Sequence, residues 1–146
     1  MTKQVKIISW TGQLVAAAVL GQSLYFKLSA APEAVHIFST LGVEPWGRIG
    51  LALVELVTVG LLLNPRTAAT GAVVALGLMV GAISSHLLVL GVNFQGDGGT
   101  LFAMAWIVFA AASIVAYLRR RQIPILGSRL AVADADHRPP ETSGVA

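Results

Sequence analysis

The 146-residue sequence contains no cysteine and few charged residues. Without cysteine, the chain cannot form disulfides, thiolate metal sites, iron–sulfur clusters or covalent haem attachments. Any redox function would therefore need a noncovalent cofactor or a second protein. Charged residues make up 12% of the chain and hydrophobic residues 55%, with a mean hydropathy of +0.77. Because a soluble domain carries about twice this share of charge, the composition indicates an integral membrane protein.

Four long runs with few charges predict four membrane-spanning helices. They cover about residues 7–26, 46–63, 67–92 and 100–118. A helix of about twenty residues crosses a hydrocarbon core of about 30 Å. A cleaved signal peptide is an alternative for the first run, but that run is longer than the apolar part of a signal peptide. Short connections at alternate ends predict an all-α, antiparallel four-helix bundle over residues 1–123.

The segments outside these runs give two further predictions. Residues 29–45 form the longest connection, in which Pro32 suits the first turn of a helix and Gly42 suits the position after its end. We therefore expect a short helix along the outer surface. From about Pro124 the chain is polar without apolar periodicity, and residues 124–146 are predicted to be a disordered cytoplasmic tail.

Small residues in the third run predict close helix packing. Gly77 and Gly81 form a small-xxx-small pair, and Ser85 continues nearly the same face. Such pairs let the backbones of neighbouring membrane helices approach each other. We expect this face to lie against another helix of the bundle.

The basic residues predict the orientation of the chain in the bilayer. Eight of them share one side if the N-terminus is inside: Lys3, Lys6, Arg66, Arg119, Arg120, Arg121, Arg129 and Arg138. Only Lys27 and Arg48 lie near the other face, so the positive-inside rule places both termini in the cytoplasm. The pI of 9.8 therefore reflects basic residues at the ends of the membrane-spanning runs, and nucleic acid is not an expected partner.

Five polar residues are predicted to lie in or next to the outer third of the bundle. They are Lys27, Arg48, Glu55, His86 and Asp97. A charge at the bilayer centre costs about 2.5 to 3.5 kcal/mol, and such residues usually face the bundle interior. No ionisable residue is expected in the inner half. The shared depth predicts one polar ligand-binding cavity that opens outward, with Glu55 and His86 as candidate catalytic groups and no metal.

Each of these residues also has a structural interpretation. Arg48 precedes Glu55 by seven residues on nearly the same helix face, so the two could form a buried pair that fixes helix registry. Lys27 could extend to the interface, His86 could be neutral and hydrogen-bonded across the bundle, and Asp97 could cap the last helix. The face of Lys27 continues through a stripe formed by Ser23, Leu20, Ala16 and Gln13.

A combination of short segments spread over about residues 5–123 carries a family resemblance. The segments are GQSLYFKL at 21–28, LGVEPWGRIG at 41–50, Glu55 with Gly60, GAISSHL at 81–87 and DGG at 97–99. Together they resemble the DoxX family of small bacterial and archaeal membrane proteins. The resemblance implies a four-helix bundle in a bacterial or archaeal cell membrane. It also implies that Lys27, Glu55, His86 and Asp97 occupy family positions, with Arg48 a weaker fifth.

Two functions follow from this resemblance and these residues. DoxX proteins are similar to the membrane subunit of archaeal thiosulfate:quinone oxidoreductase, and relatives are linked to redox-stress complexes and to small-molecule or lipid handling. The first expectation is a membrane subunit of a quinone-linked oxidoreductase complex, in which Glu55 and His86 exchange protons with quinone and a separate protein supplies electrons. Without cysteine to carry a sulfur intermediate, autonomous thiosulfate oxidation is not expected.

The alternative is a noncatalytic membrane protein. Apolar walls with a few convergent polar groups would hold a lipid, an isoprenoid or a small solute, or the chain would assist assembly of a partner. A transporter has the weakest basis, because four spans without broken helices or an inverted repeat offer little for alternating access. A homo-oligomer would supply additional helices.

Overall fold

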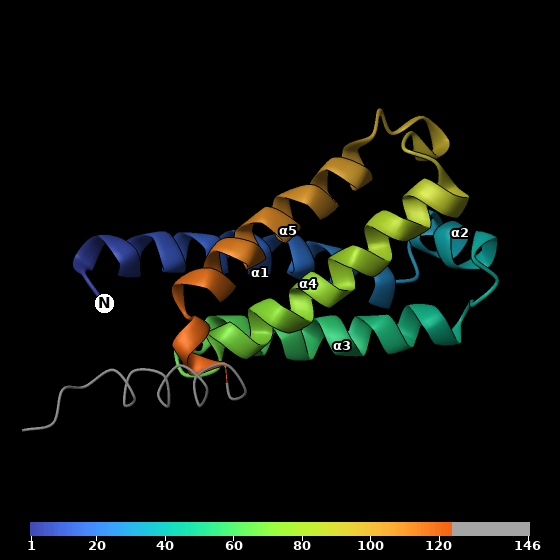
Figure 1. Ribbon diagram of the computed structural model, residues 1–146. Helices are drawn as coiled ribbons and strands as arrows, with labels where there is room; N and C mark the ends of the chain where they lie inside the picture. Colours follow the sequence, from blue (N-terminus) through green and yellow to red (C-terminus); the bar gives the residue numbers. More distant parts are fainter. Residues whose placement is uncertain (124–146) are drawn as a thin grey trace, which may run out of the picture.

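The computed structural model describes residues 1–123, and its elements there are all helical. Four long helices form an antiparallel bundle, as predicted (Figure 1). They are α1 (Lys3–Leu28), α3 (Trp46–Leu63), α4 (Ala68–Ser85) and α5 (Thr100–Leu118). Helices α1 and α4 each pack mainly against α3 and α5, so the order around the bundle is α1, α3, α4, α5. The predicted tail, 124–146, lies outside the described residues.

All four helices are long and apolar enough to cross a membrane. The third candidate span continues beyond α4 to Leu90. Helix α1 begins earlier than the hydropathy pattern predicts, because Thr2 caps it and its hydroxyl accepts a hydrogen bond from the Val5 N–H. Lys3 and Lys6 therefore belong to the first turns of α1 rather than to a preceding segment.

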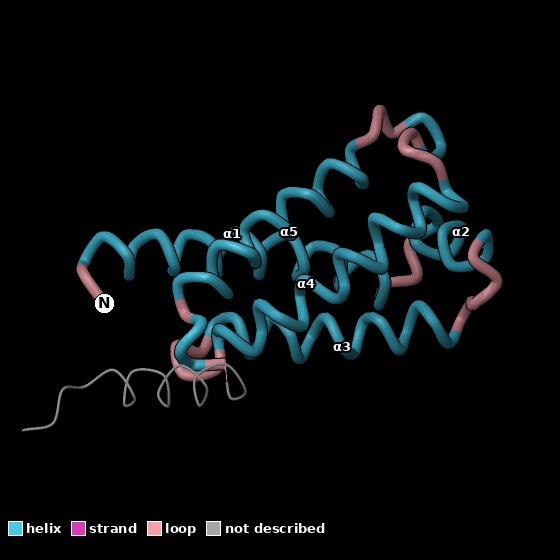
Figure 2. Tube along the Cα trace, in the orientation of Figure 1, coloured by secondary structure: helices cyan, strands magenta, loops and turns pink. Residues whose placement is uncertain are grey.

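The two ends of the bundle differ in their connections (Figure 2). The end that carries α2 (Pro32–Thr40) and the segment between α4 and α5 is called the loop end; it is the predicted outer end. The opposite end, where α1 begins, α3 turns into α4 and α5 finishes, is called the terminal end. Helix α2 confirms the predicted loop helix. Pro32 occupies its first turn, Gly42 follows it with a φ of 74°, and Ala34 and Phe38 are buried.

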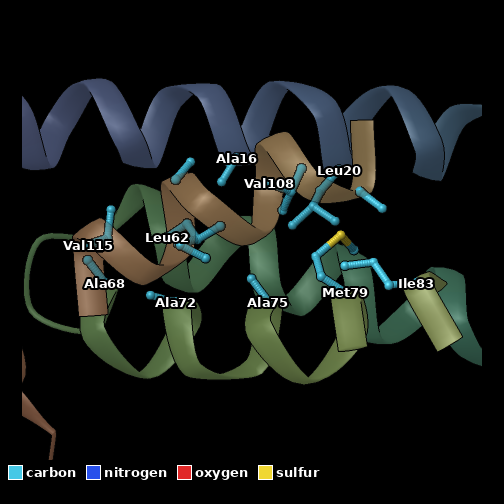
Figure 3. Close-up of a cluster of buried hydrophobic side chains, with 13 residues drawn as sticks. Ala16, Leu20, Leu62, Ala68, Ala72, Ala75, Met79, Ile83, Val108 and Val115 are labelled. Carbon is cyan, nitrogen blue, oxygen red and sulfur yellow. The ribbon is translucent and has the colours of Figure 1, made fainter. Parts of the chain in front are cut away.

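Small side chains dominate the core between the four long helices (Figure 3). Ala16, Ala72 and Ala75 are fully buried, together with larger residues such as Leu62 and Val108. Apolar burial has little driving force between helices in lipid, so membrane bundles depend on close packing of small residues. Alanine-rich faces meet this need here.

The closest helix approaches involve glycines other than the predicted pair. A Cβ atom on Gly71 would lie 2.8 Å from the Leu62 backbone nitrogen, and one on Gly12 would lie 2.9 Å from Val115 Cγ2. Gly77 and Gly81 are exposed, with no atom within 4 Å of an added Cβ. The prediction that these two glycines pack inside the bundle is therefore wrong. The face of α4 that turns inward carries other small residues, Gly71, Ala72 and Ala75, followed by Met79 and Ile83.

The end of α4 widens into a π-helical turn, His86–Leu90, which is followed by Gly91 with a φ of 80°. The helix therefore stops before the predicted residue 92. Two short 3-10 turns complete the described chain, Phe94–Gly96 before α5 and Arg120–Gln122 after it. Because π-turns often occur at functional sites, the geometry around His86 is of particular interest.

Candidate functional site

A buried ion pair connects α1 and α3. The Lys27 ammonium lies 3.0 Å from Glu55 Oε1 and 3.1 Å from Oε2. Ser23 also contributes, because its hydroxyl donates to Glu55 Oε1 at 3.3 Å and accepts a hydrogen bond from Lys27. The side chains of Lys27 and Glu55 are only 11% and 4% exposed. Each charge therefore has its counter-ion inside the bundle.

The direction of the Lys27 side chain explains this pairing. Side chains on an α-helix lean toward its N-terminus, so Lys27, near the end of α1, reaches back over Ser23. It extends into the bundle and does not run outward to the interface. The stripe below it is also directed inward, since Leu20, Ala16 and Gln13 are buried, as the sequence pattern predicts.

Arg48 has partners other than the one predicted for it. Its Nε donates to both carboxylate oxygens of Glu44, at 2.9 and 3.0 Å, and its Nη2 lies 2.8 Å from Glu44 Oε1. Its Nη1 donates to the backbone carbonyl of Lys27. The predicted direct contact between Arg48 and Glu55 is therefore wrong: Lys27 from α1 is the nearer partner of Glu55. The periodicity of α3 alone cannot predict that Lys27, a residue of another helix, lies beside Glu55.

These contacts form one continuous polar network at the loop end. Glu44 binds Arg48, Arg48 binds the Lys27 carbonyl, and the Lys27 ammonium binds Glu55. Arg48 and Glu55 are 8% and 3% exposed. The network ties the end of α1 to both the beginning and the middle of α3.

His86 is buried at the start of the π-turn and is held by Gly91. Its Nδ1 lies 2.9 Å from the Gly91 carbonyl oxygen, and its own carbonyl accepts from the Gly91 N–H at 2.7 Å. Because a carbonyl oxygen only accepts hydrogen bonds, Nδ1 carries the proton. The neutral ring then has its lone pair on Nε2, which makes that nitrogen the basic atom. Phe102 packs edge-on against the ring at 5.8 Å between centroids.

Asp97 stabilises the start of α5, as its position predicts. Its carboxylate accepts hydrogen bonds from the Leu101 N–H at 2.9 Å and the Gly99 N–H at 2.8 Å. The Leu101 hydrogen bond lowers the pKa of Asp97 most, against the desolvation that raises it, and the Gly99 hydrogen bond lowers it further. The net result is a pKa of Asp97 below its usual range.

The five residues therefore form two groups at the loop end. Lys27, Arg48 and Glu55 belong to the α1–α3 network, whereas His86 and Asp97 lie where α4 gives way to α5. A single cavity shared by all five stays a prediction. Within residues 1–123, no group of three or more metal-ligating side chains occurs.

One buried polar cluster at the terminal end was not predicted. Arg119 is 6% exposed, and its Nε donates to the Ser9 hydroxyl at 2.6 Å. Gln13 donates to the same hydroxyl at 2.8 Å, while its own Oε1 is buried without a hydrogen-bond partner among the described residues. The expectation that this half contains no ionisable residue is wrong: local sequence places Arg119 in a charged flank, but helix packing buries it beside Ser9. The sequence offered one indication of this cluster: Ser9 and Gln13 are two polar residues four positions apart, and therefore on one face of α1.

Four apolar spans with paired charges between them define an integral membrane protein of the four-helix class. Residues 11–115 match the model of the DoxX-like family, which is well over half of the chain. The chain belongs to this family. No curated protein and no solved structure gives a significant match.

Proposed function

We propose that this chain is the membrane subunit of a quinone-linked oxidoreductase complex and that it handles protons at the loop end. The observation that carries the proposal is the Lys27–Glu55 pair, with both side chains buried between membrane-spanning helices. Ionisable groups are costly in a membrane and usually mark proton or ligand pathways. Reduction of a bound quinone takes up protons together with electrons, so proton-exchanging side chains suit it.

His86 is the group best arranged to exchange a proton with a ligand. The Gly91 carbonyl holds Nδ1 and fixes the tautomer, so Nε2 accepts a proton from a hydroxyl and, once protonated, donates to a carbonyl. Glu55 and Lys27 would supply the second exchangeable pair. These roles remain part of the proposal, as does the outward-opening cavity that would join them.

The surroundings of His86 also suit a flat apolar ring. Phe102, Trp106 and Phe109 continue from His86 along α5 as successive edge-on contacts, with centroids 5.6 to 6.3 Å apart. Trp106 is 47% exposed on the lipid-facing side. Aromatic faces and edges favour ring ligands by stacking or edge contact. A quinone ring beside His86 would therefore meet an apolar surface and one proton-exchanging nitrogen.

Electrons must come from another protein in this proposal. The chain has no cysteine for an iron–sulfur cluster or thiol relay. The partner is thus an oxidoreductase, soluble or membrane-bound, that delivers electrons to the quinone.

The test uses the full-length protein purified in mild detergent. Quinone retained through purification is quantified for the wild type and for His86→Gln, Glu55→Gln and His36→Gln. His36→Gln is the matched control, because His36 is an exposed loop-end histidine in ring contact with Phe94. We expect quinone to be retained in the wild type and the control and lost in His86→Gln. Equal retention in all folded variants would overturn the assignment of His86.

A second function has one observation in its favour. Within the described network both ion pairs are complete, since Glu55 is matched by Lys27 and Glu44 by Arg48. Such pairing suits a noncatalytic protein whose charges fix helix registry while the bundle holds a lipid or assists a partner. Copurification separates the two: an oxidoreductase recovered in stoichiometric amount supports the first function, and lipid alone supports the second.

A further inference from the structure

The buried Arg119 guanidinium at the terminal end contacts neutral groups. Its Nε donates to the Ser9 hydroxyl at 2.6 Å, and its Nη1 donates to the Pro65 carbonyl at 2.7 Å. Nη1 also lies 3.5 Å from the Gln122 side-chain oxygen. These partners satisfy hydrogen bonds but bring no negative charge. Burial lowers the pKa of Arg119, although arginine remains protonated at any physiological pH.

Within the described residues, every charged side chain at the terminal end is basic. Its six cationic side chains are Lys3, Lys6, Arg66, Arg119, Arg120 and Arg121. The carboxylates within residues 1–123 are Glu33, Glu44, Glu55 and Asp97, which lie at the loop end or in the middle of α3. No described carboxylate lies at the terminal end, and the partners of Arg119 within residues 1–123 are the neutral groups of Ser9, Pro65 and Gln122.

A pocket of about 250 Å³ opens beside this guanidinium. It is lined by Met1, Leu118, Arg119, Arg120, Arg121 and Gln122. Arg120 is exposed and held in place: its Nη1 donates to the Tyr117 carbonyl at 3.2 Å, and its guanidinium lies 4.7 Å from the centre of the Tyr117 ring. The pocket thus combines several arginines with one apolar wall, Leu118, at the end of a membrane-spanning helix.

We propose that this pocket binds the phosphodiester headgroup of an anionic membrane phospholipid. Arginine donates paired hydrogen bonds that match phosphate oxygens, and a phosphate would place a negative charge beside Arg119, whose partners among residues 1–123 are neutral. The position at the end of α5 lets the acyl chains lie along Leu118 and the apolar helix surface. Basic pockets at the ends of membrane helices recognise anionic headgroups in this way. The inference is independent of the quinone proposal.

The test measures lipid binding to the full-length protein after delipidation in detergent. Dioleoyl phosphatidylglycerol and the zwitterionic dioleoyl phosphatidylcholine are titrated separately, with affinity from native mass spectrometry and apparent Tm from thermal unfolding. We expect phosphatidylglycerol to bind more tightly and to raise the Tm more. Arg120→Gln should weaken its binding about fivefold, since one basic residue near a charged lipid surface contributes on that scale. Arg120 is exposed, so this variant leaves the helix core intact.

Lys6→Gln is the matched control, because it removes one exposed charge from the same end without touching the pocket. It should bind phosphatidylglycerol as the wild type does. Equal weakening by Arg120→Gln and Lys6→Gln would overturn the pocket in favour of diffuse attraction. Inorganic phosphate is titrated in parallel, and stabilisation by phosphate equal to that by phosphatidylglycerol would overturn a lipid as the ligand. Equal affinity for phosphatidylglycerol and phosphatidylcholine would overturn the whole proposal.

Discussion

The Lys27 ammonium lies 3.0 Å from Glu55 Oε1, although the two residues are 28 positions apart and belong to different helices. This contact determines the chemistry of the loop end. It gives Glu55 a counter-ion within the bundle. Arg48 binds Glu44 and the Lys27 carbonyl instead of Glu55. The Lys27–Glu55 pair and the bond from Arg48 to the Lys27 carbonyl thus depend on how α1 lies against α3, whereas the Arg48–Glu44 pair is local to the start of α3.

Removing one partner of this pair should destabilise the protein strongly. Lys27→Met leaves the Glu55 carboxylate buried without its counter-ion, and we expect a loss of about 3 to 5 kcal/mol in the free energy of unfolding. The double variant Lys27→Met/Glu55→Met should recover most of this loss, because neither charge is then buried alone. Unfolding in detergent micelles measures both. Additive losses in the double variant would show that the two side chains are not energetically coupled.

The bridging role of Arg48 should be sensitive to its side-chain geometry. Arg48→Lys keeps the charge but cannot contact both Glu44 and the Lys27 carbonyl, so we expect a loss of about 1.5 to 3 kcal/mol, the scale of a charged hydrogen bond. Faster amide hydrogen exchange should appear at residues 41–48. Arg66→Lys, an exposed change at the terminal end, is the control and should leave exchange there unaltered.

Glycine substitutions should separate packed from exposed positions. Gly71→Ala places a Cβ 2.8 Å from the Leu62 nitrogen, and Gly12→Ala places one 3.2 Å from the Ala111 carbonyl oxygen, so backbones must shift in both. A loss of about 1 to 3 kcal/mol is expected for each. Gly77→Ala and Gly81→Ala meet open space and should be neutral or stabilising, since alanine favours helix by about 1 kcal/mol. A lower Tm for Gly77→Ala than for Gly71→Ala would contradict this packing.

The capping carboxylate of Asp97 should make the stability of the protein depend on pH in the acidic range. Because hydrogen bonds from Leu101 and Gly99 lower its pKa in the folded protein, the stabilisation is present at neutral pH. It is lost as the pH falls below the unfolded value of about 3.9 and through the lower folded one. Asp97→Asn should therefore lower the Tm at pH 7, with a difference from wild type that shrinks toward pH 3. Glu33→Gln, an exposed acid in α2, should show no such effect at pH 7.

Hydropathy and charge predict the membrane spans well, because each is a local property of a run of residues. The start of α3 at Trp46 and the end of α5 at Leu118 coincide with the limits of the predicted apolar runs. Pro32 predicts the start of α2 for an equally local reason, since its ring suits a first helical turn. Asp97 as a cap follows from its position before Gly98, Gly99 and the next apolar run.

Which polar side chain meets which other one was decided by tertiary structure alone. Periodicity places Arg48 and Glu55 on one face of α3, but the α1–α3 packing puts Lys27 within reach of Glu55 first. The same holds for Arg119, which local sequence assigns to a charged flank and which packing buries beside Ser9.

The sequence by itself therefore determined that the chain forms four apolar helices with polar residues concentrated near one end and basic residues near the other. These features depend on composition and spacing within single segments, which the bilayer environment selects directly. Only the tertiary structure decided that Glu55 pairs with Lys27, that Gly71 and not Gly77 lies at a close helix contact, and that Arg119 is buried beside a basic pocket. Each of these depends on the rotation of one helix against another. That rotation is set by interdigitation of side chains from several segments at once.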